Sequence, residues 1–138
     1  GNVFLHNYTE QKIEKWNFIE GFTELSLDLS SNYELSELTI VGGFIGGVGV
    51  KIPENEREAF IIPKDFSSAE TEFILNEITR PFYISSIDGD FLFSGLNGIG
   101  DEVAFGRYGT DDSPKWNKTI TQIDSYSYSD CIIGAYPF

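Results

Sequence analysis

The chain has 138 residues, of which 41% are hydrophobic and 15% aromatic, and its formal net charge is −13. This length and apolar content argue against a disordered chain and predict a single domain, residues 1–138, with its own core. Because 22 acidic residues face only 9 Lys and Arg, nucleic-acid binding through phosphate contacts and docking on an anionic membrane are both disfavoured. The longest apolar run, residues 40–50, is rich in glycine and about half as long as a bilayer span, so no membrane helix is expected.

The single cysteine, Cys131, has no partner for an intrachain disulfide. The only histidine, His6, is far away in sequence, so we interpret Cys131 as a small buried apolar residue and not as a nucleophile. The sequence begins at Gly1 and contains no methionine. A removed signal peptide or a cleaved tag would explain this, and we expect a secreted protein.

In chain order, the first ambiguous segment surrounds Ile13 and Trp16. It is compatible with one helical turn, or with a strand that faces Trp16 and Phe18 inward. Alternating leucines follow at Leu25, Leu27 and Leu29, as a half-buried strand requires. The strands that we predict are residues 22–29, 35–40, 48–52, 59–62, 81–87, 91–94, 102–106, 119–123 and 132–136.

Two further segments are special. Five glycines in residues 42–49 predict a loop or a flexible edge, because they lack the spacing and the following helix of a dinucleotide-binding loop. Residues 67–70 read as a capping box that would begin a short helix, whereas residues 71–75 are also acceptable as a strand, which we favour.

One pattern recurs three times, at residues 37–44, 86–91 and 122–126. In each copy, a stretch of alternating apolar residues is followed by small or acidic turn residues and then by an aromatic residue. The repeat predicts an all-β fold of antiparallel Greek-key sheets with pseudo-threefold, β-prism-like symmetry and little helix.

Motifs for chemistry are scarce. The sequence has no nucleophile elbow, no cluster of metal-binding histidines and no helix–loop–helix calcium loop. Acidic pairs in turns, at residues 88–90 and 111–112, are the only candidates for calcium, and acidic turns of this kind commonly bind no metal. We therefore expect no cofactor and no enzymatic activity.

The aromatic residues near the C-terminal end are more suggestive. Tyr126 and Tyr128 alternate with serines, so both rings face the same side, and Asp130 follows closely. Aromatic rings stack on the apolar faces of sugars, while a carboxylate accepts hydrogen bonds from sugar hydroxyls. This pattern indicates a shallow carbohydrate site, although a half-buried strand face would also explain the tyrosines.

The order of several segments resembles the jacalin-related lectins. The matching pieces, in the order of that family, are residues 21–27, 37–40, 72–75, 84–87, 105–110 and 130–136. The resemblance implies a β-prism of three four-stranded sheets around a pseudo-threefold axis. It also implies a sugar site in which a C-terminal loop of the form Gly-x-x-x-Asp lies beside an N-terminal glycine.

Carried over to this chain, Asp130 matches the aspartate of that loop. Ser127 and Tyr128 match the positions whose backbone amides face the sugar. Tyr126 stands where the family has its loop glycine, and the N-terminal double glycine is missing. The resemblance implies a carbohydrate-binding module for a glycan or a glycoprotein. The alternative is an acidic inhibitor or immunity-type protein whose −13 charge binds a basic protein partner.

Overall fold

The computed structural model describes residues 2–98 and 102–121. Within these ranges it contains eleven strands and no helix, so the all-β prediction is confirmed. The first sheet has the order β1 (Asn2–Asn7), β2 (Lys12–Asn17), β3 (Phe22–Asp28). The middle sheet has the order β4 (Asn32–Val41), β5 (Phe44–Ile52), β6 (Glu56–Pro63), β7 (Thr71–Glu72). The last sheet has the order β11 (Pro114–Thr121), β10 (Glu102–Tyr108), β9 (Asp90–Asn97), β8 (Arg80–Ile87).

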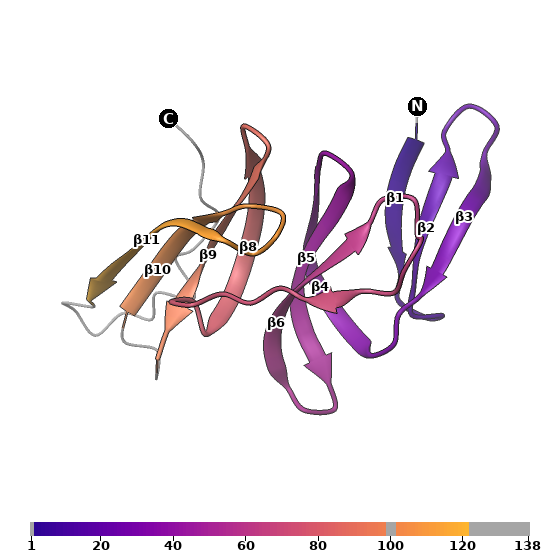
Figure 1. Cartoon of the computed structure of the whole chain (residues 1–138). Coiled ribbons are helices and arrows are strands. Elements are labelled where there is room, and N and C mark those ends of the chain that lie inside the picture. The colour runs from indigo at the N-terminus through magenta and orange to yellow at the C-terminus, as the bar shows by residue number, and fades with distance from the viewer. Residues whose placement is uncertain (1, 99–101, 122–138) are drawn as a thin grey trace.

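The three sheets stand in a row, with the middle sheet between the other two (Figure 1). All strand pairs are antiparallel, and in each sheet the strands are neighbours in chain order. The described sheets are therefore meanders, and the prediction of Greek-key sheets is wrong for them, because each strand returns beside the one before it. The part of the chain that the structure describes holds no helix that could span a membrane.

The middle sheet is covered on both faces. Ile45, Phe60 and Ile62 belong to a core cluster shared with the first sheet, whereas Val48 and Ala59 belong to a cluster shared with the last sheet. This division follows from strand geometry, because successive side chains point to opposite faces. Strands β5 and β6 are therefore apolar on both faces and do not alternate between apolar and polar residues.

The predicted loop through residues 42–49 is wrong beyond the two-residue turn at its start, because most of this segment forms strand β5. The glycines inside the strand allow close packing. A Cβ atom on Gly46 would lie 2.6 Å from the ring of Phe91, and one on Gly47 would lie 2.3 Å from the ring of Phe60. Glycine at these positions lets bulky neighbouring rings lie directly against the backbone.

Two copies of the sequence repeat are hairpins. The first copy spans the β4–β5 turn, and the second spans the β8–β9 turn at Asp88 and Gly89. Both residues of this second turn have positive φ, 45° and 81°, as a two-residue type I′ turn requires. The third copy, at residues 122–126, lies outside the described residues, as does the predicted strand at residues 132–136.

The pseudo-threefold prism arrangement is not confirmed. A prism would gather its three sheets around one common interior, whereas the described residues pack in two main clusters on opposite faces of the middle sheet. Leu38 of the first repeat packs against one cluster, and Ile84, just before the second repeat, lies in the other.

The N-terminal segment differs from its prediction. Strand β1 was not predicted, and the ambiguous segment forms strand β2 with Ile13 facing inward. Trp16 lies on the opposite face from Ile13, and Phe18 is 76% exposed in the turn, so the prediction that both face inward is wrong. The favoured strand at residues 71–75 is present only as the two residues of β7.

Candidate functional site

The sugar site predicted from sequence comprises Tyr126, Ser127, Tyr128 and Asp130, and all four lie outside the described residues. Within the described ranges, the same chemistry would need an aromatic ring beside a carboxylate or an ion pair. Trp16 bonds a carboxylate directly, whereas Trp116 lies opposite Arg107, which bonds the Asp90 carboxylate; the two tryptophans lie on different sheets.

The first arrangement comprises Asp90, Arg107 and Trp116 on the outward face of the last sheet, which is the face turned away from the middle sheet. Phe91 and Tyr108 point to the inner cluster, so by alternation Asp90 and Arg107 point outward. Trp116 lies directly opposite Arg107 in the β10–β11 register, and residues paired in this way share a face.

An ion pair between Arg107 and Asp90 holds two side chains of this arrangement in place. The Arg107 Nε–H group donates to Asp90 Oδ2 at 2.7 Å, and both side chains are largely shielded from solvent. Trp116 is 41% exposed, so part of its ring is open to a ligand. An ion pair held at this distance fixes one acceptor and one donor beside the ring, because a charge-assisted hydrogen bond is short and directional.

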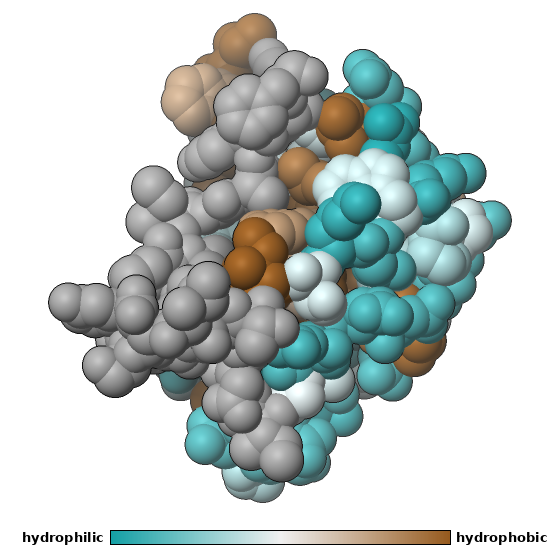
Figure 2. All heavy atoms as spheres, turned by 90° about the vertical axis from the view of Figure 1, so that its left-hand side faces the viewer, coloured by the Kyte–Doolittle hydropathy of each residue, from teal (hydrophilic) through white to brown (hydrophobic). Residues whose placement is uncertain are grey.

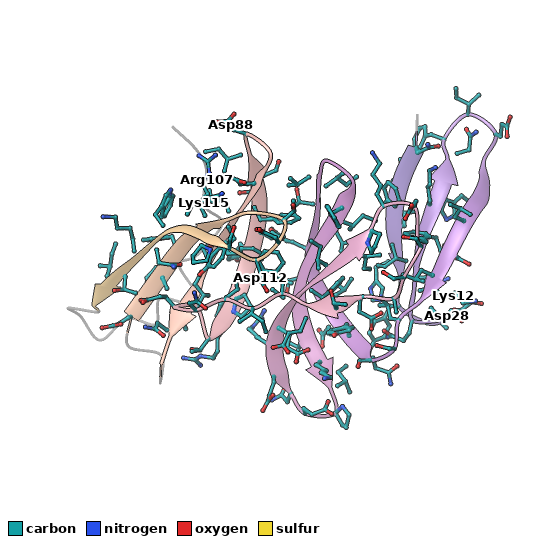
Figure 3. The ribbon with its side chains drawn as sticks, viewed as in Figure 1. Lys12, Asp28, Asp88, Arg107, Asp112 and Lys115 are labelled. Carbon is teal, nitrogen blue, oxygen red and sulfur yellow. The ribbon has the colours of Figure 1, made fainter. Side chains whose placement is uncertain are left out.

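Two turns place these side chains. Figure 3 shows Asp88, Arg107 and Lys115 at the same end of the last sheet. At the β10–β11 turn, Asp111 Oδ1 accepts hydrogen bonds from the backbone N–H and the hydroxyl of Ser113. These bonds hold the pKa of Asp111 below its usual value, with the Ser113 hydroxyl as the main cause. Hydrogen bonds between its own residues thus stabilise this turn.

The acidic turns do not form a metal site in the described residues. No group of three or more His, Cys, Asp or Glu side chains within residues 2–98 and 102–121 is placed to hold a metal ion. Asp90 is engaged by Arg107, and Asp111 is engaged by Ser113. The carboxylate oxygens of these two residues therefore accept hydrogen bonds from protein donors.

The second arrangement lies on the first sheet. The Trp16 indole N–H donates to Glu14 Oε2 at 2.9 Å, and Asn7 Nδ2 donates to Glu14 Oε1 at 3.5 Å. Leu5 pairs with Glu14 across β1 and β2 and is 46% exposed. A carboxylate has about four lone-pair positions, so Glu14 keeps acceptor capacity after these two bonds.

The surface around the last sheet is mixed in character. Figure 2 looks onto this side of the molecule and shows a described surface that is mainly hydrophilic, with apolar side chains between the polar ones. Leu92, Ser94 and Leu96 on the outward face of β9 are buried, so the exposed part of the site lies toward the edge strand β11. Such a surface suits a polar ligand with apolar faces better than a purely apolar partner.

Sequence reasoning did not find Asp90, Arg107 and Trp116 as a unit. They are 17 and 9 residues apart in sequence and meet only through the β9–β10–β11 pairing. The available signal was alternation: Phe105 and Arg107 are two residues apart in β10, so both must face the same side. Which residue of β11 lies opposite them depends on the register of the hairpin.

Comparison of the chain with protein-family models, with curated proteins and with solved structures finds no match in any of the three.

Proposed function

We propose that this protein is a non-enzymatic, lectin-like carbohydrate-binding module, and that Trp116 with the Arg107–Asp90 pair forms its sugar platform. The observation that carries the proposal is an exposed indole ring fixed in register beside a short, shielded ion pair. The ring offers an apolar face, the carboxylate accepts hydrogen bonds, and the guanidinium donates them.

The charge of the chain agrees with such a ligand. A net charge of −13 repels polyanions, whereas a neutral sugar feels no such repulsion and gains from stacking and hydroxyl hydrogen bonds. The ring of Trp116 is rigid, so little side-chain entropy is lost when a ligand stacks on it.

The jacalin-like β-prism and its sugar loop are a finer version of this proposal. That version places the site at Tyr126, Ser127, Tyr128 and Asp130, and it predicts that Asp130 is essential for binding. The two versions share a ligand class and differ in the residues that bind it, so one set of variants separates them.

A glycan array with the full chain, followed by calorimetry on the best glycan, tests the proposal. We expect Trp116→Ala to weaken binding about tenfold or more, since stacking and the apolar area are lost together. Phe18→Ala is the matched control, because Phe18 is a more exposed aromatic residue at a hairpin tip. It should leave binding unchanged.

Other outcomes are equally informative. No glycan retained anywhere on the array contradicts the function itself. Binding that is lost in Asp130→Ala and kept in Trp116→Ala moves the site to the loop predicted from sequence. Binding that depends on Trp16 and not on Trp116 moves it to the first sheet.

A second candidate function rests on charge alone: an acidic inhibitor that binds a basic protein. Its support is the excess of 22 acidic over 9 basic residues. Electrostatic association of this kind weakens as ionic strength rises. Recovery of a basic partner at low salt that is lost at high salt would favour it over the glycan proposal.

A further inference from the structure

A cavity of about 530 Å³ opens between the middle and last sheets. Its walls come from the end of β5, the β5–β6 turn, the beginning of β6 and the beginning of β8. The lining residues are Val50, Asn55, Glu56, Arg57, Thr79, Arg80 and Phe82. Cavities of this size are in the range that holds small-molecule ligands.

Two arginines line this cavity, Arg57 from β6 and Arg80 from β8. The chain has three arginines, and Arg107 is engaged by Asp90. Among the described residues, neither Arg57 nor Arg80 forms an ion pair with a carboxylate. Two guanidinium groups without an ion pair among the described residues are unexpected in one cavity of a chain with 22 acidic residues.

The hydrogen bonding of the two groups is incomplete. Arg80 Nε is buried and has no hydrogen-bond partner. Arg57 donates only through Nη1, to Ser36 Oγ at 3.3 Å and to the Pro81 carbonyl at 3.4 Å. A guanidinium group has five N–H donors, so most donors of this pair have no acceptor within residues 2–98 and 102–121. A buried donor without a partner costs about 1–3 kcal/mol unless a ligand or water satisfies it.

The position of Arg57 is fixed by aromatic contact. Its Cζ atom lies 3.9 Å from the centroid of the Phe82 ring, which holds the guanidinium plane at the cavity wall. Burial lowers the pKa of Arg57; the nearby Tyr83 and Glu34 oppose this shift, and the positive charge of Arg80 adds to it. An anion bound to both arginines would offset the cost of burying the Arg57 charge and reduce the repulsion between the two positive groups.

We propose that this cavity binds the carboxylate group of a small acidic molecule about the size of a monosaccharide, such as a uronic acid. A planar carboxylate matches the fork of a guanidinium group. Asn55 adds an amide at the turn, and Val50 and Phe82 supply apolar wall for the rest of the molecule.

Charge selects a carboxylate over a phosphate. Glu56 lies on the same cavity wall, and the whole chain carries −13, so each added negative charge on the ligand increases the repulsion. A ligand with one negative charge can contact both guanidinium groups and is repelled less by the acidic residues than a ligand with two negative charges. The cavity is separate from Trp116, so this inference stands independently of the proposed sugar platform.

The test is a ¹⁵N–¹H NMR titration of the full chain with sodium glucuronate, with glucose as the matched neutral sugar and inorganic phosphate as the third ligand. We expect glucuronate to give saturable shifts at the amides of Asn55, Arg57 and Arg80, and glucose to give none there. Arg80→Gln should weaken glucuronate binding about tenfold, which is the loss of one charge-assisted contact. Lys12→Gln removes a positive charge on the first sheet, away from the cavity and from Trp116, and should leave this binding unchanged.

Identical shifts with glucose and glucuronate, or undiminished binding in Arg80→Gln, would overturn the proposal. Tighter binding of phosphate than of glucuronate would overturn the assignment to a carboxylate. If Arg80→Gln does not fold, Arg80→Lys decides, because it keeps the charge and removes the fork; unchanged affinity in that variant counts against a bidentate site. Failure of glycan binding at Trp116 leaves these outcomes unaffected.

Discussion

The two faces of the middle sheet are packed in different ways. On the face toward the last sheet, the rings of Phe73, Phe91, Phe93 and Tyr108 form a cluster with centroids 5.2–6.1 Å apart. Strand β8 runs close to β4, β5 and β6 on this side. On the face toward the first sheet, the cluster is mainly aliphatic, with two separate aromatic pairs, Tyr33 with Phe60 and Phe4 with Phe66.

Hydrogen bonds lie at the margins of both interfaces, with Glu37 and Arg57 bonded to β8 on the side of the last sheet. On the side of the first sheet, Gln11 Oε1 accepts the Tyr33 N–H at 3.0 Å, and the Gln11 carbonyl accepts the Leu29 N–H at 2.9 Å. The buried carboxylate of Glu70 accepts the backbone N–H and the hydroxyl of Ser30. Among the described strands, none of the first sheet approaches the middle sheet as closely as β8 does.

The two interfaces therefore depend on apolar contact to different degrees. The interface with the last sheet buries interlocked rings against a glycine-lined strand, so its stability comes from packing. The interface with the first sheet has no strand packed as closely on the middle sheet as β8 among the described residues, and its ring pairs are separate. We therefore expect the first sheet to open locally at a lower free energy than the other two.

The largest effects should come from the adjacent glycines of β5, which face opposite interfaces. Gly46→Ala presses on Phe91 and Ile84, and Gly47→Ala presses on the Phe60 ring. Overpacking of this kind costs about 1–3 kcal/mol of unfolding free energy, measured by chemical denaturation. Gly43→Ala is the control, since a Cβ there has no neighbour within 4 Å.

Hydrogen exchange on the same variants tests whether the two interfaces of the middle sheet open separately. Gly46→Ala should lower protection throughout the molecule, whereas Gly47→Ala should lower it mainly in β1–β3. Equal loss of protection in all three sheets for both variants would show that the two interfaces open as one unit.

A medium effect is expected at the polar margin of the first sheet. Gln11→Met keeps the length of the side chain and removes the acceptor for the Tyr33 N–H. Loss of a hydrogen bond of this type costs about 1 kcal/mol. The exchange of the Tyr33 amide should become faster, while amides in β9 keep their rates; an unchanged Tyr33 amide would contradict the role of this bond.

The smallest effect concerns pH. Burial lowers the pKa of His6 in β1, and the nearby Gln11 side chain partly opposes the shift. Because the folded-state pKa is below that of the unfolded chain, near 6.5, the unfolded state takes up the proton first as pH falls. The His6 contribution to stability is therefore present above pH about 6.5 and is lost below it.

The measurement is the difference in unfolding free energy between the protein and His6→Gln across pH 5–8. Carboxylates affect both proteins equally, so the difference isolates His6. A difference that does not vary with pH would contradict the prediction.

The sequence predicted most of the strands, and particular residues show why. Leu25, Leu27 and Leu29 alternate, and the Asp88–Gly89 pair has the conformational freedom of a tight hairpin turn. The glycine segment failed because glycine in a buried strand and glycine in a loop look alike in sequence. What distinguishes them is whether a ring such as Phe91 lies against the backbone.

The functional candidates show the same division. Sequence alone supplied a chemical class, an aromatic ring beside a carboxylate, but assigned it to the loop that ends at Asp130. The grouping of Trp116 with Arg107 and Asp90, and of Arg57 with Arg80, arises from register and from the packing of one sheet on another. No local sequence pattern predicts that these side chains lie together, because they belong to different strands.

By itself, the sequence determined the strand-forming character of the chain, its turns and its acidic surface, since these depend on neighbouring residues and on composition. The tertiary structure alone decided that the middle sheet buries both faces and that two arginines share one cavity. The physical reason is that side-chain alternation is a local property, whereas the choice of what covers each face depends on contacts between residues far apart in the chain.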